Sequence, residues 1–244
     1  MEKKVVLVTG ASRGIGKAIA ERFIQEQYHV ALNCKNRITE MNEQIKTYQE
    51  INPNIIGIQA DVSCYEETER MFSEIIKHYG QIDILVNNAG VANINLFTDL
   101  TPNDFHFIMN TNSLSVMNCS HLAVKNMLLR KSGCIVNISS IWGSSGASCE
   151  VVYSASKGAV DSFTKALAKE LAPSGIRVNA IACGVIHTEM NNQLSEEEKQ
   201  ALAEDIPLMR FGQPSEIAEL VFFLAEKKSA YITGQVIKAD GGFL

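Results

Sequence analysis

The chain has 244 residues, enough for one large α/β domain or two small ones. Hydrophobic residues make up 46% and charged residues 20%, a balance that permits a sizeable buried core and excludes a largely disordered chain. The formal net charge of −5 argues against a dedicated binder of nucleic acid or of anionic membranes. No apolar run approaches the roughly 18 residues that a membrane-spanning helix requires.

The six cysteines are scattered, form no C-x-x-C pair, and none stands at metal-ligand spacing with a histidine. We therefore expect no metal site, and reduced buried thiols of the kind found in cytosolic proteins. The N-terminal residues reach a glycine turn too soon for a signal peptide, so the expected location is the cytoplasm.

Short apolar runs alternate with longer helical patterns along the chain. The runs predict strands at Val5–Thr9, His29–Asn33, Ile55–Ala60, Ile82–Asn87, Cys134–Ser139, Arg177–Ile181 and Gln235–Ala239, and the patterns predict helices near 14–27, 38–51, 65–79, 103–130, 151–172 and 214–226. This alternation predicts an α/β protein with a three-layer, doubly wound Rossmann fold and a seven-stranded, mostly parallel sheet. We expect a single domain, residues 1–244.

One segment, residues 187–212, breaks the alternation. It is polar, contains Glu196-Glu197-Glu198-Lys199, and ends in Pro207 and Gly212. A charged run of this kind is also typical of a solvated helix face. Its position after the carboxyl end of a late strand favours a substrate lid.

The first strand runs directly into a glycine-rich turn, Gly10-Ala11-Ser12-Arg13-Gly14-Ile15-Gly16, and a helix follows. Glycines allow a tight turn and let the backbone approach a pyrophosphate at the helix N-terminus. The spacing is G-x-x-x-G-x-G rather than the commoner G-x-G-x-x-G. Its place at the first strand–helix junction favours a dinucleotide-binding site over a simple connector.

The residues at the end of the second strand indicate which dinucleotide the site binds. A carboxylate there would bind the ribose 2′-hydroxyl of NAD, but the sequence reads Asn33-Cys34-Lys35-Asn36-Arg37. Lys35, Arg37 and Arg13 of the glycine turn could instead bind a 2′-phosphate, although each alone is also typical of an ordinary surface charge. We therefore expect NADPH/NADP rather than NAD.

Tyr153 and Lys157 lie four residues apart in a predicted helix, which places both side chains on one face. A tyrosine with an ordinary pKa near ~10 is a poor acid–base catalyst at neutral pH. A neighbouring ammonium favours the phenolate and lowers that pKa. The pair therefore predicts a phenol able to give or take a proton.

Together, several ordered motifs resemble the classical short-chain dehydrogenase/reductase family. They are Thr9-Gly10-Ala11-Ser12-Arg13-Gly14-Ile15-Gly16, Asn87-Asn88-Ala89-Gly90, Ser140 thirteen residues before Tyr153, and Lys157. The resemblance extends from Val5 to Asp240-Gly241-Gly242 and is greatest to the 3-oxoacyl-[acyl-carrier-protein] reductases of fatty-acid synthesis. It implies reduction of a 3-oxoacyl thioester to the 3-hydroxyacyl form.

The resemblance implies a catalytic set of Asn112, Ser140, Tyr153 and Lys157. Tyr153 would donate the proton, Lys157 would lower its pKa and hold the nicotinamide ribose, and Ser140 would bind the carbonyl oxygen. Asn112 would orient a water that links Lys157 to solvent. Asn110 and Ser139 are neighbouring alternatives to Asn112 and Ser140, and the family register selects against them.

The remaining cofactor contacts are also implied by the resemblance. Asp61 and Val62 match the pair that meets the adenine, Asn88, Ala89 and Gly90 lie along the cofactor, and Ile186 and Thr188 match the stretch that holds the nicotinamide carboxamide. One position departs from the family, because Cys183-Gly184 replaces the usual Pro-Gly. We interpret Cys183 as a tolerated substitution rather than a reactive thiol.

The substrate carrier and the assembly are the least specified features. Acyl carrier proteins are acidic, and relatives that use them present basic residues at two positions near the site mouth. Arg130 and Lys131 would supply the first of these positions, whereas Ser174 stands at the second. Relatives form tetramers through helices matching 103–130 and 151–172, so we expect a homotetramer. Two alternatives stay open: a dehydrogenase of sugars, polyols or other secondary alcohols, and a non-enzymatic nucleotide sensor.

Overall fold

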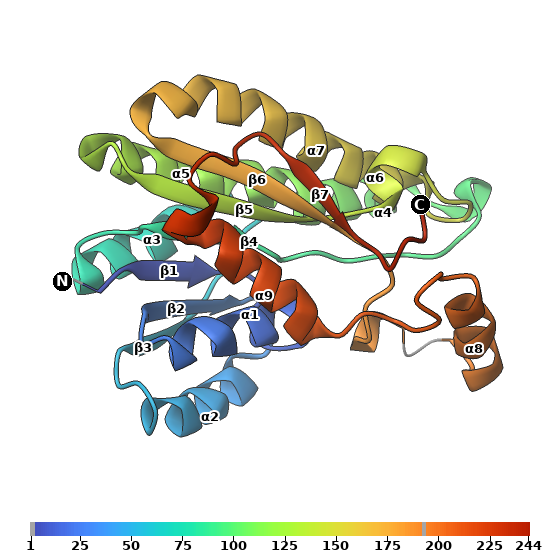
Figure 1. The fold of residues 1–244 in the computed structure, drawn as a ribbon, viewed down its shortest axis with the longest axis horizontal. Coiled ribbons are helices and arrows are strands. Elements are labelled where there is room, and N and C mark those ends of the chain that lie inside the picture. The colour runs from blue at the N-terminus through green and yellow to red at the C-terminus, as the bar shows by residue number, and fades with distance from the viewer. Residues whose placement is uncertain (1–2, 192–193) are drawn as a thin grey trace.

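A computed structural model describes residues 3–191 and 194–244 as a parallel sheet covered by helices on both faces (Figure 1). Within these residues, seven strands pair in the order β3-β2-β1-β4-β5-β6-β7, and every pairing is parallel. The strands are β1 (Val5–Val8), β2 (His29–Cys34), β3 (Ile55–Gln59), β4 (Ile84–Asn87), β5 (Gly133–Ser140), β6 (Ile176–Cys183) and β7 (Val236–Ala239). The predicted doubly wound fold is confirmed, with a sheet that is parallel throughout.

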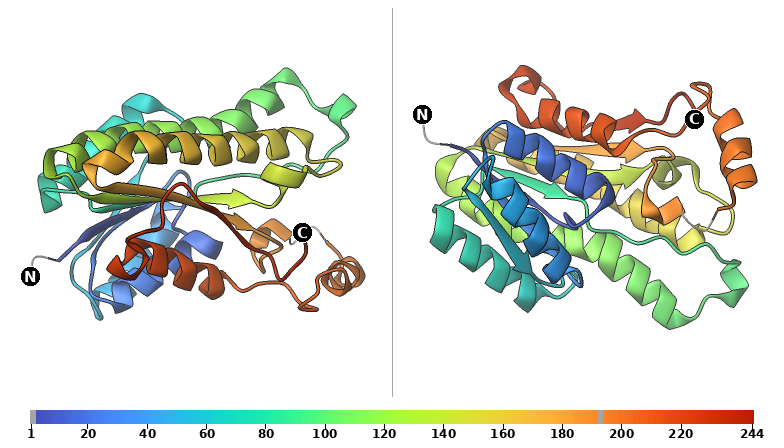
Figure 2. Two further views of the ribbon diagram at one scale, coloured as in Figure 1. Left: turned by 45° about the horizontal axis from the view of Figure 1, so that its top comes forward. Right: turned by 90° about the horizontal axis from the view of Figure 1, so that it is seen from below.

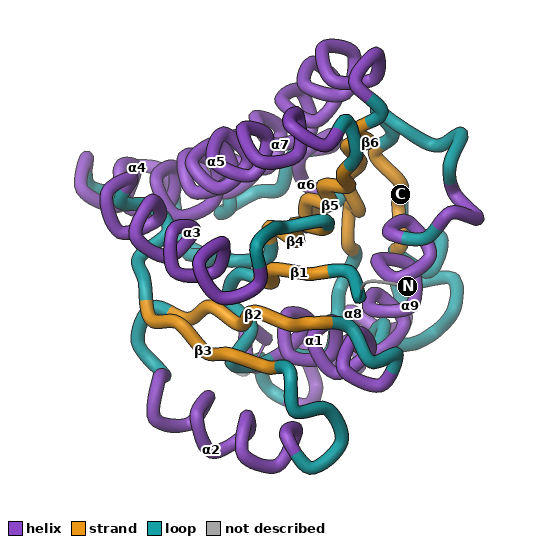
Figure 3. The backbone as a smooth tube through the Cα atoms, turned by 90° about the vertical axis from the view of Figure 1, so that its left-hand side faces the viewer, coloured by secondary structure: helices purple, strands orange, loops and turns teal. Residues whose placement is uncertain are grey.

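Most of the helices form two outer layers on the faces of the sheet (Figures 2 and 3). They are α1 (Gly14–Gln25), α2 (Ile38–Gln49), α3 (Tyr65–Tyr79), α4 (Pro102–Met109), α5 (Ser115–Arg130), α6 (Trp142–Ser145), α7 (Val151–Leu171), α8 (Glu196–Glu204) and α9 (Pro214–Ala225). One core cluster packs α1, α2 and α9 against the sheet, and a second packs α3, α5 and α7 against its other face. Because both faces are covered, strands such as β1 and β4 are buried at every residue, as their continuous apolar sequence predicts.

The sequence predicted one helix over 103–130, whereas the structure divides it. A π-helical turn, η2 (Asn110–Leu114), separates α4 from α5. Such a turn inserts one residue into the helical repeat and changes which side chains face inward, and it occurs frequently at functional sites. The start at Pro102 follows from local chemistry, because Thr101 and Asp104 form a reciprocal capping box.

Residues 187–212 form an excursion beyond the carboxyl end of β6, with α8 extending from the body of the molecule (Figure 1). Its two ends are joined by a parallel bridge between Ile186 and Gly212 and by a hydrogen bond from His187 N to Gly212 O of 2.8 Å. Residues 192–193 of this predicted lid lie outside the described residues. The segment is therefore a loop closed at its base.

No helix in the described part of the chain is long and apolar enough to cross a membrane. In the same part of the chain, no cluster of His, Cys, Asp and Glu side chains could hold a metal ion.

Candidate active site

The predicted site residues gather where the strands of the sheet end at their carboxyl termini. The glycine turn follows β1, Asn88-Ala89-Gly90 follows β4, and Ser140 is the last residue of β5. Since β1 lies between β2 and β4, the direction of winding reverses beside β1. Ligands of doubly wound sheets bind in the crevice at this reversal.

The glycine turn is held by residues that follow β4. The side chain of Asn88 donates from Nδ2 to the carbonyl oxygens of Thr9 and Gly10, at 3.0 and 3.1 Å. Gly10 has φ +62°, and a Cβ there would come within 2.9 Å of the Ala89 Cα. A Cβ on Gly16 would lie 2.4 Å from both Asn88 Nδ2 and the Gly10 carbonyl. These glycines are required by close packing of the turn itself, and Asn88 thus has a structural role at least.

The first turn of α1 is open to an anion. Its N-cap residue, Arg13, has extended backbone geometry and makes no side-chain cap hydrogen bond. The backbone N–H groups of the first turn, around Ile15, therefore have no intrahelical partner and can bind a phosphate group together with the helix dipole. This geometry fits the dinucleotide site predicted from the glycine spacing.

The three basic residues predicted at the 2′-phosphate are each paired with a carboxylate. Arg13 and Arg37 both contact the carboxylate of Glu189, at 2.5 and 3.2 Å, which shows that the two guanidinium groups can reach one anion. Lys35 instead contacts Asp61 at 2.6 Å, and Asp61 also accepts a hydrogen bond from Ser63. The arginines therefore form the convergent pair.

Lys35 also helps to line an open hollow that includes Asp61, one of the two residues predicted to meet the adenine. The hollow has a volume of about 420 Å³ and is lined by Lys35, Asn36, Gln59, Asp61, Glu67 and Arg70. Asp61 follows the end of β3. Burial tends to raise the pKa of its carboxyl, but hydrogen bonds from Lys35 and Ser63 outweigh burial and hold that pKa below its usual range.

Tyr153 and Lys157 lie in the first two turns of α7, facing the end of β5. The Lys157 ammonium is buried and donates to the Ile138 carbonyl at 2.9 Å, while its Nζ lies 5.7 Å from the centroid of the Tyr153 ring. Burial lowers the pKa of Lys157 to about 8, against the raising effects of Cys183 and Asp161. The lysine is thus the buried cation of the site.

The structure corrects the expected effect of this lysine on the tyrosine. Burial raises the pKa of Tyr153 well above its usual value, and a hydrogen bond with Ser140 opposes that rise. Lys157 does not reverse this rise, although its ammonium, which donates to the Ile138 carbonyl, lies 5.7 Å from the centroid of the ring. In this geometry the phenol holds its proton, and Ser140 is its neighbour at the end of β5.

Asn112, and not Asn110, faces the site. Asn112 is fully buried in the π-helical turn, where it accepts from Val91 N at 2.8 Å and donates to Val91 O at 2.9 Å. Its Nδ2 also donates to Ser156 Oγ on α7. Asn110 is exposed. A Cβ built on Gly90 would lie 3.3 Å from Asn112 Oδ1 and 3.5 Å from Lys157 Nζ, so both side chains border the same glycine.

Ser139 and Ser140 have different surroundings although they are adjacent. The Ser139 hydroxyl donates to the buried carboxylate of Asp161 at 2.6 Å, within the layer formed by α7. Burial raises the pKa of Asp161 against this hydrogen bond. The sequence analysis missed Asp161, which its position four residues after Lys157 on the same helix face could have indicated.

The segment after β6 faces the glycine turn. A Cβ built on Gly14 would lie 3.4 Å from the Thr188 methyl group, and Ile186 is buried. Cys183, at the end of β6, is buried too, and burial raises the pKa of its thiol to about 12 although Lys157 lowers it. A thiol of this kind is a poor nucleophile, in agreement with a tolerated substitution.

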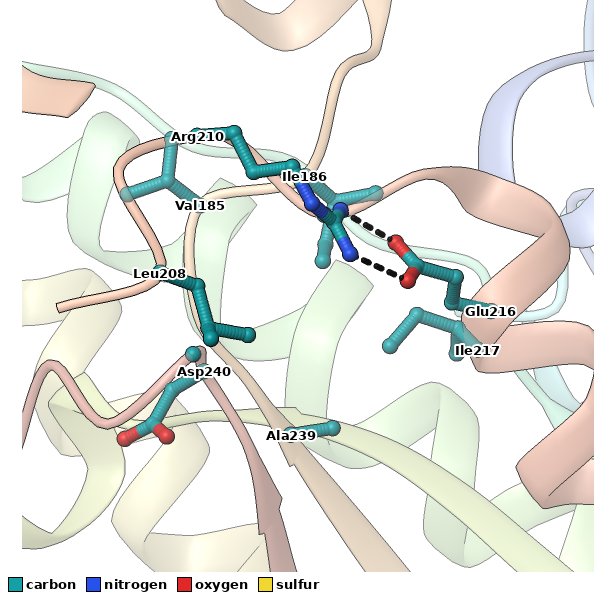
Figure 4. Close-up of a pocket in the computed structure, with 10 residues that line it drawn as sticks. Val185, Ile186, Leu208, Arg210, Glu216, Ile217, Ala239 and Asp240 are labelled. Atoms are coloured by element: carbon teal, nitrogen blue, oxygen red, sulfur yellow. Dashed lines mark hydrogen bonds and ion pairs between the residues drawn. The ribbon is translucent and has the colours of Figure 1, made fainter. Parts of the chain in front are cut away.

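A small cavity lies at the base of the 187–212 loop (Figure 4). It has a volume of about 180 Å³, and an ion pair in which Arg210 donates to both oxygens of Glu216 lies at its side. Its lining consists of Val185, Ile186, Leu208, Arg210, Gly212, Glu216, Ile217, Ala239, Asp240 and Gly241. Tyr153 and Ser140 are not among them, whereas Ile186, which was predicted to hold the nicotinamide carboxamide, is.

Arg130 lies at the opposite edge of the sheet from Ser140, because it precedes the amino end of β5. Its guanidinium contacts the Asp83 carboxylate and donates to the Ile82 carbonyl at 2.6 Å. The Arg130 side chain thus joins α5 to the residues that precede β4, and the basic patch predicted at Arg130 and Lys131 stays a prediction.

The comparisons with known proteins agree with this geometry. The family described as Enoyl-(Acyl carrier protein) reductase matches residues 10–244. The chain is 41% identical over 243 residues to an uncharacterized oxidoreductase, YmfI, of Bacillus subtilis, covering 98% of each chain. It is 41% identical over 242 residues to the 3-oxoacyl-[acyl-carrier-protein] reductase FabG of Staphylococcus aureus, covering 98% of this chain and 97% of the relative. It is 37% identical over 244 residues to the enzyme of that name from Thermotoga maritima, covering 100% and 99%.

Proposed function

We propose that the chain, which belongs to the short-chain dehydrogenase/reductase family, reduces a 3-oxoacyl thioester to the 3-hydroxyacyl form with NADPH. Membership of the family makes it an oxidoreductase that uses a nicotinamide dinucleotide. The observation that supports this most is the meeting of the buried residues Ser140, Lys157 and Asn112 with the partly exposed Tyr153 at the carboxyl edge of the sheet. The names of the relatives favour a thioester carried by acyl carrier protein, and a CoA thioester has the same reacting group.

The residues of the chain account for the proton half of the reaction. When bound, the cofactor supplies a hydride to the carbonyl carbon, and the carbonyl oxygen must then gain a proton. Tyr153 retains its proton at neutral pH, since burial raises its pKa, and it is the group we assign as general acid. Ser140 stabilises the charge that develops on the oxygen through a hydrogen bond.

Lys157 and Asn112 support the acid rather than contact the carbonyl. With a pKa of about 8, Lys157 is mostly charged at pH 7, and its ammonium stabilises the phenolate that remains after Tyr153 gives up its proton. Asn112 lies across Gly90 from that ammonium, the position from which it would orient a water that returns a proton from solvent.

The choice of NADPH over NADH rests on the end of β2. No acid occupies the stretch from Asn33 to Arg37, and Arg13 and Arg37 reach one anion. Guanidinium groups bind phosphate oxygens through paired N–H donors, an interaction that an uncharged ribose hydroxyl cannot supply. Replacing Arg37 with Asp should invert the ratio of kcat/KM for NADPH and NADH, and an unchanged ratio would contradict the assignment.

The substrate is tested by the oxidation of NADPH at 340 nm with acetoacetyl-CoA, and then with a panel of sugars, polyols and simple ketones. Thioester activity that falls about 10²-fold or more in Tyr153→Phe, with cofactor binding retained, supports the proposal. Activity restricted to sugars or alcohols would identify a dehydrogenase of another substrate. Cofactor binding without turnover of any compound would identify a nucleotide sensor.

We propose that the full chain, residues 1–244, is one cofactor-binding domain that acts in the cytoplasm as a homotetramer. Large apolar side chains are exposed on α5 and at the start of α7, among them Leu129 at 84% and Val151 at 46%. Their burial between copies of the chain would remove this apolar surface from water. Light scattering on the purified protein tests the assembly, and a monomer at micromolar concentration would refute it.

A further inference from the structure

Glu189 is the first residue of a short 3-10 turn, η4 (Glu189–Asn191), directly after Thr188. Its carboxylate contacts Arg13 of the glycine turn at 2.5 Å and Arg37, the N-cap residue of α2, at 3.2 Å. Three segments far apart in the sequence thus meet in one charged contact. All three side chains are between 40% and 53% exposed, so a ligand can reach the contact from solvent.

The carboxylate occupies the pair of cations that the proposed function assigns to the 2′-phosphate. A phosphate monoester has a charge of about −1.5 to −2 at neutral pH, and a carboxylate beside it would repel it. Arg37 also contacts Glu40 at 3.6 Å, so with Glu189 in place the two guanidinium groups and the two carboxylates have no net charge. Without Glu189 the same group would offer a single net positive charge to an incoming phosphate.

The backbone at Glu189 is held independently of its carboxylate. Asn191 N donates to Thr188 O at 3.1 Å, and Asn191 Nδ2 donates to Ile186 O at 2.8 Å. The Glu189 side chain can therefore rotate away from the arginines without disruption of the turn. Displacement requires only side-chain torsions and the loss of exposed ion pairs, which are individually weak.

We propose that Glu189 is a specificity-determining residue that competes with the 2′-phosphate of the cofactor for Arg13 and Arg37. The proposal rests on the NADP-dependent function proposed above. NADP(H) must displace the carboxylate to bind, whereas NAD(H), which lacks the phosphate, leaves it on the arginines. Glu189 thus weakens the binding of NADP(H) but not that of NAD(H). It thereby narrows the difference in affinity between the two cofactors.

The test is the affinity of the full-length protein for NADP⁺ and for NAD⁺, measured by titration calorimetry at low ionic strength. Glu189→Gln keeps the size of the side chain and removes its charge. It should lower the Kd for NADP⁺ by about three- to tenfold and change the Kd for NAD⁺ less than about twofold. The NADP⁺ effect should shrink at high salt, because exposed charges are screened.

Glu74→Gln is the matched control, because it removes the same charge from the exposed face of α3, and it should change neither Kd. If wild type prefers NADP⁺ and Glu189→Gln leaves the NADP⁺ affinity unchanged or weaker, the role of Glu189 is refuted while the cofactor proposal stands. If wild type prefers NAD⁺, the cofactor proposal fails. A selective gain in NADP⁺ affinity in Glu189→Gln would then still support the competition, and no gain would refute both.

Discussion

Lys157 should lower the stability of the fold at neutral pH, and this expectation can be tested with one substitution. Only 5% of the surface of this residue is exposed, and burial lowers the pKa of its ammonium from 10.5 in the unfolded chain to about 8. The unfolded chain therefore binds this proton more tightly than the folded protein does. It follows that the stability of the wild type rises with pH between about 8 and 10.5, and that the cost is complete below pH 8.

The size of this cost follows from the two pKa values. Linkage gives a destabilisation of about 3 kcal/mol at pH 7 and less than about 1 kcal/mol at pH 10, since the folded lysine is then neutral. Lys157→Met removes this cost and keeps the length of the side chain. It also removes the donor to the Ile138 carbonyl, which costs about 1 kcal/mol at either pH. We expect a variant that is about 2 kcal/mol more stable than wild type at pH 7 and no more stable at pH 10.

The assay is urea unfolding at a fixed protein concentration, followed by the fluorescence of the single tryptophan, Trp142, at both pH values. Lys169→Met is the control, because Lys169 is exposed on the same helix, and its effect should be independent of pH. A Lys157→Met effect that is equal at the two pH values, or that favours wild type at pH 7, would refute the reasoning. The catalytic rate should fall in Lys157→Met at both pH values.

The remaining predictions concern the neighbours of the site. Ser140→Ala should reduce kcat by about 10²-fold with little change in stability, whereas Ser139→Ala should retain kcat and cost about 1–3 kcal/mol in urea unfolding, because it leaves a buried carboxylate without its donor. Arg130→Ala should cost about 2–3 kcal/mol and leave kcat/KM for acetoacetyl-CoA unchanged; a stable variant, or one with altered kcat/KM, would contradict its structural role. Iodoacetamide at pH 8 should label the two partly exposed cysteines before Cys183, as mass spectrometry can show, and rapid inactivation through Cys183 would contradict its buried state.

The fold could be predicted closely from the sequence because its signals are local. Both ends of every predicted strand lie within two residues of the observed ends, because buried parallel strands have continuous apolar sequences. The division of the predicted 103–130 helix at Asn110 was missed. Nothing in the residue pattern there interrupts the helix, and the π-helical turn depends on contacts that Asn112 makes with Val91 and Ser156 from other segments.

The site was predictable in its membership and less so in its electrostatics. Motif spacing selected Ser140 over Ser139 and Asn112 over Asn110, and the structure places the selected residues by Tyr153 and Lys157. The sequence could not show that a carboxylate would meet the two arginines, because Glu189 lies more than 150 positions from either. It also could not show that burial, rather than the lysine, dominates the pKa of Tyr153.

This dominance of burial determines how the site works. A raised pKa keeps Tyr153 protonated before substrate arrives, but it also makes the phenol a weaker acid, so a group that stabilises the phenolate favours proton transfer. Here Tyr153 stays protonated, and the Lys157 ammonium, held by the Ile138 carbonyl, is positioned to act when the phenolate forms. Burial raises the pKa of the tyrosine and lowers that of the lysine. The buried ammonium therefore lowers the stability of the fold, and it assists the reaction only during proton transfer. The opposite effects of Lys157→Met on stability and on rate are therefore two consequences of one buried charge.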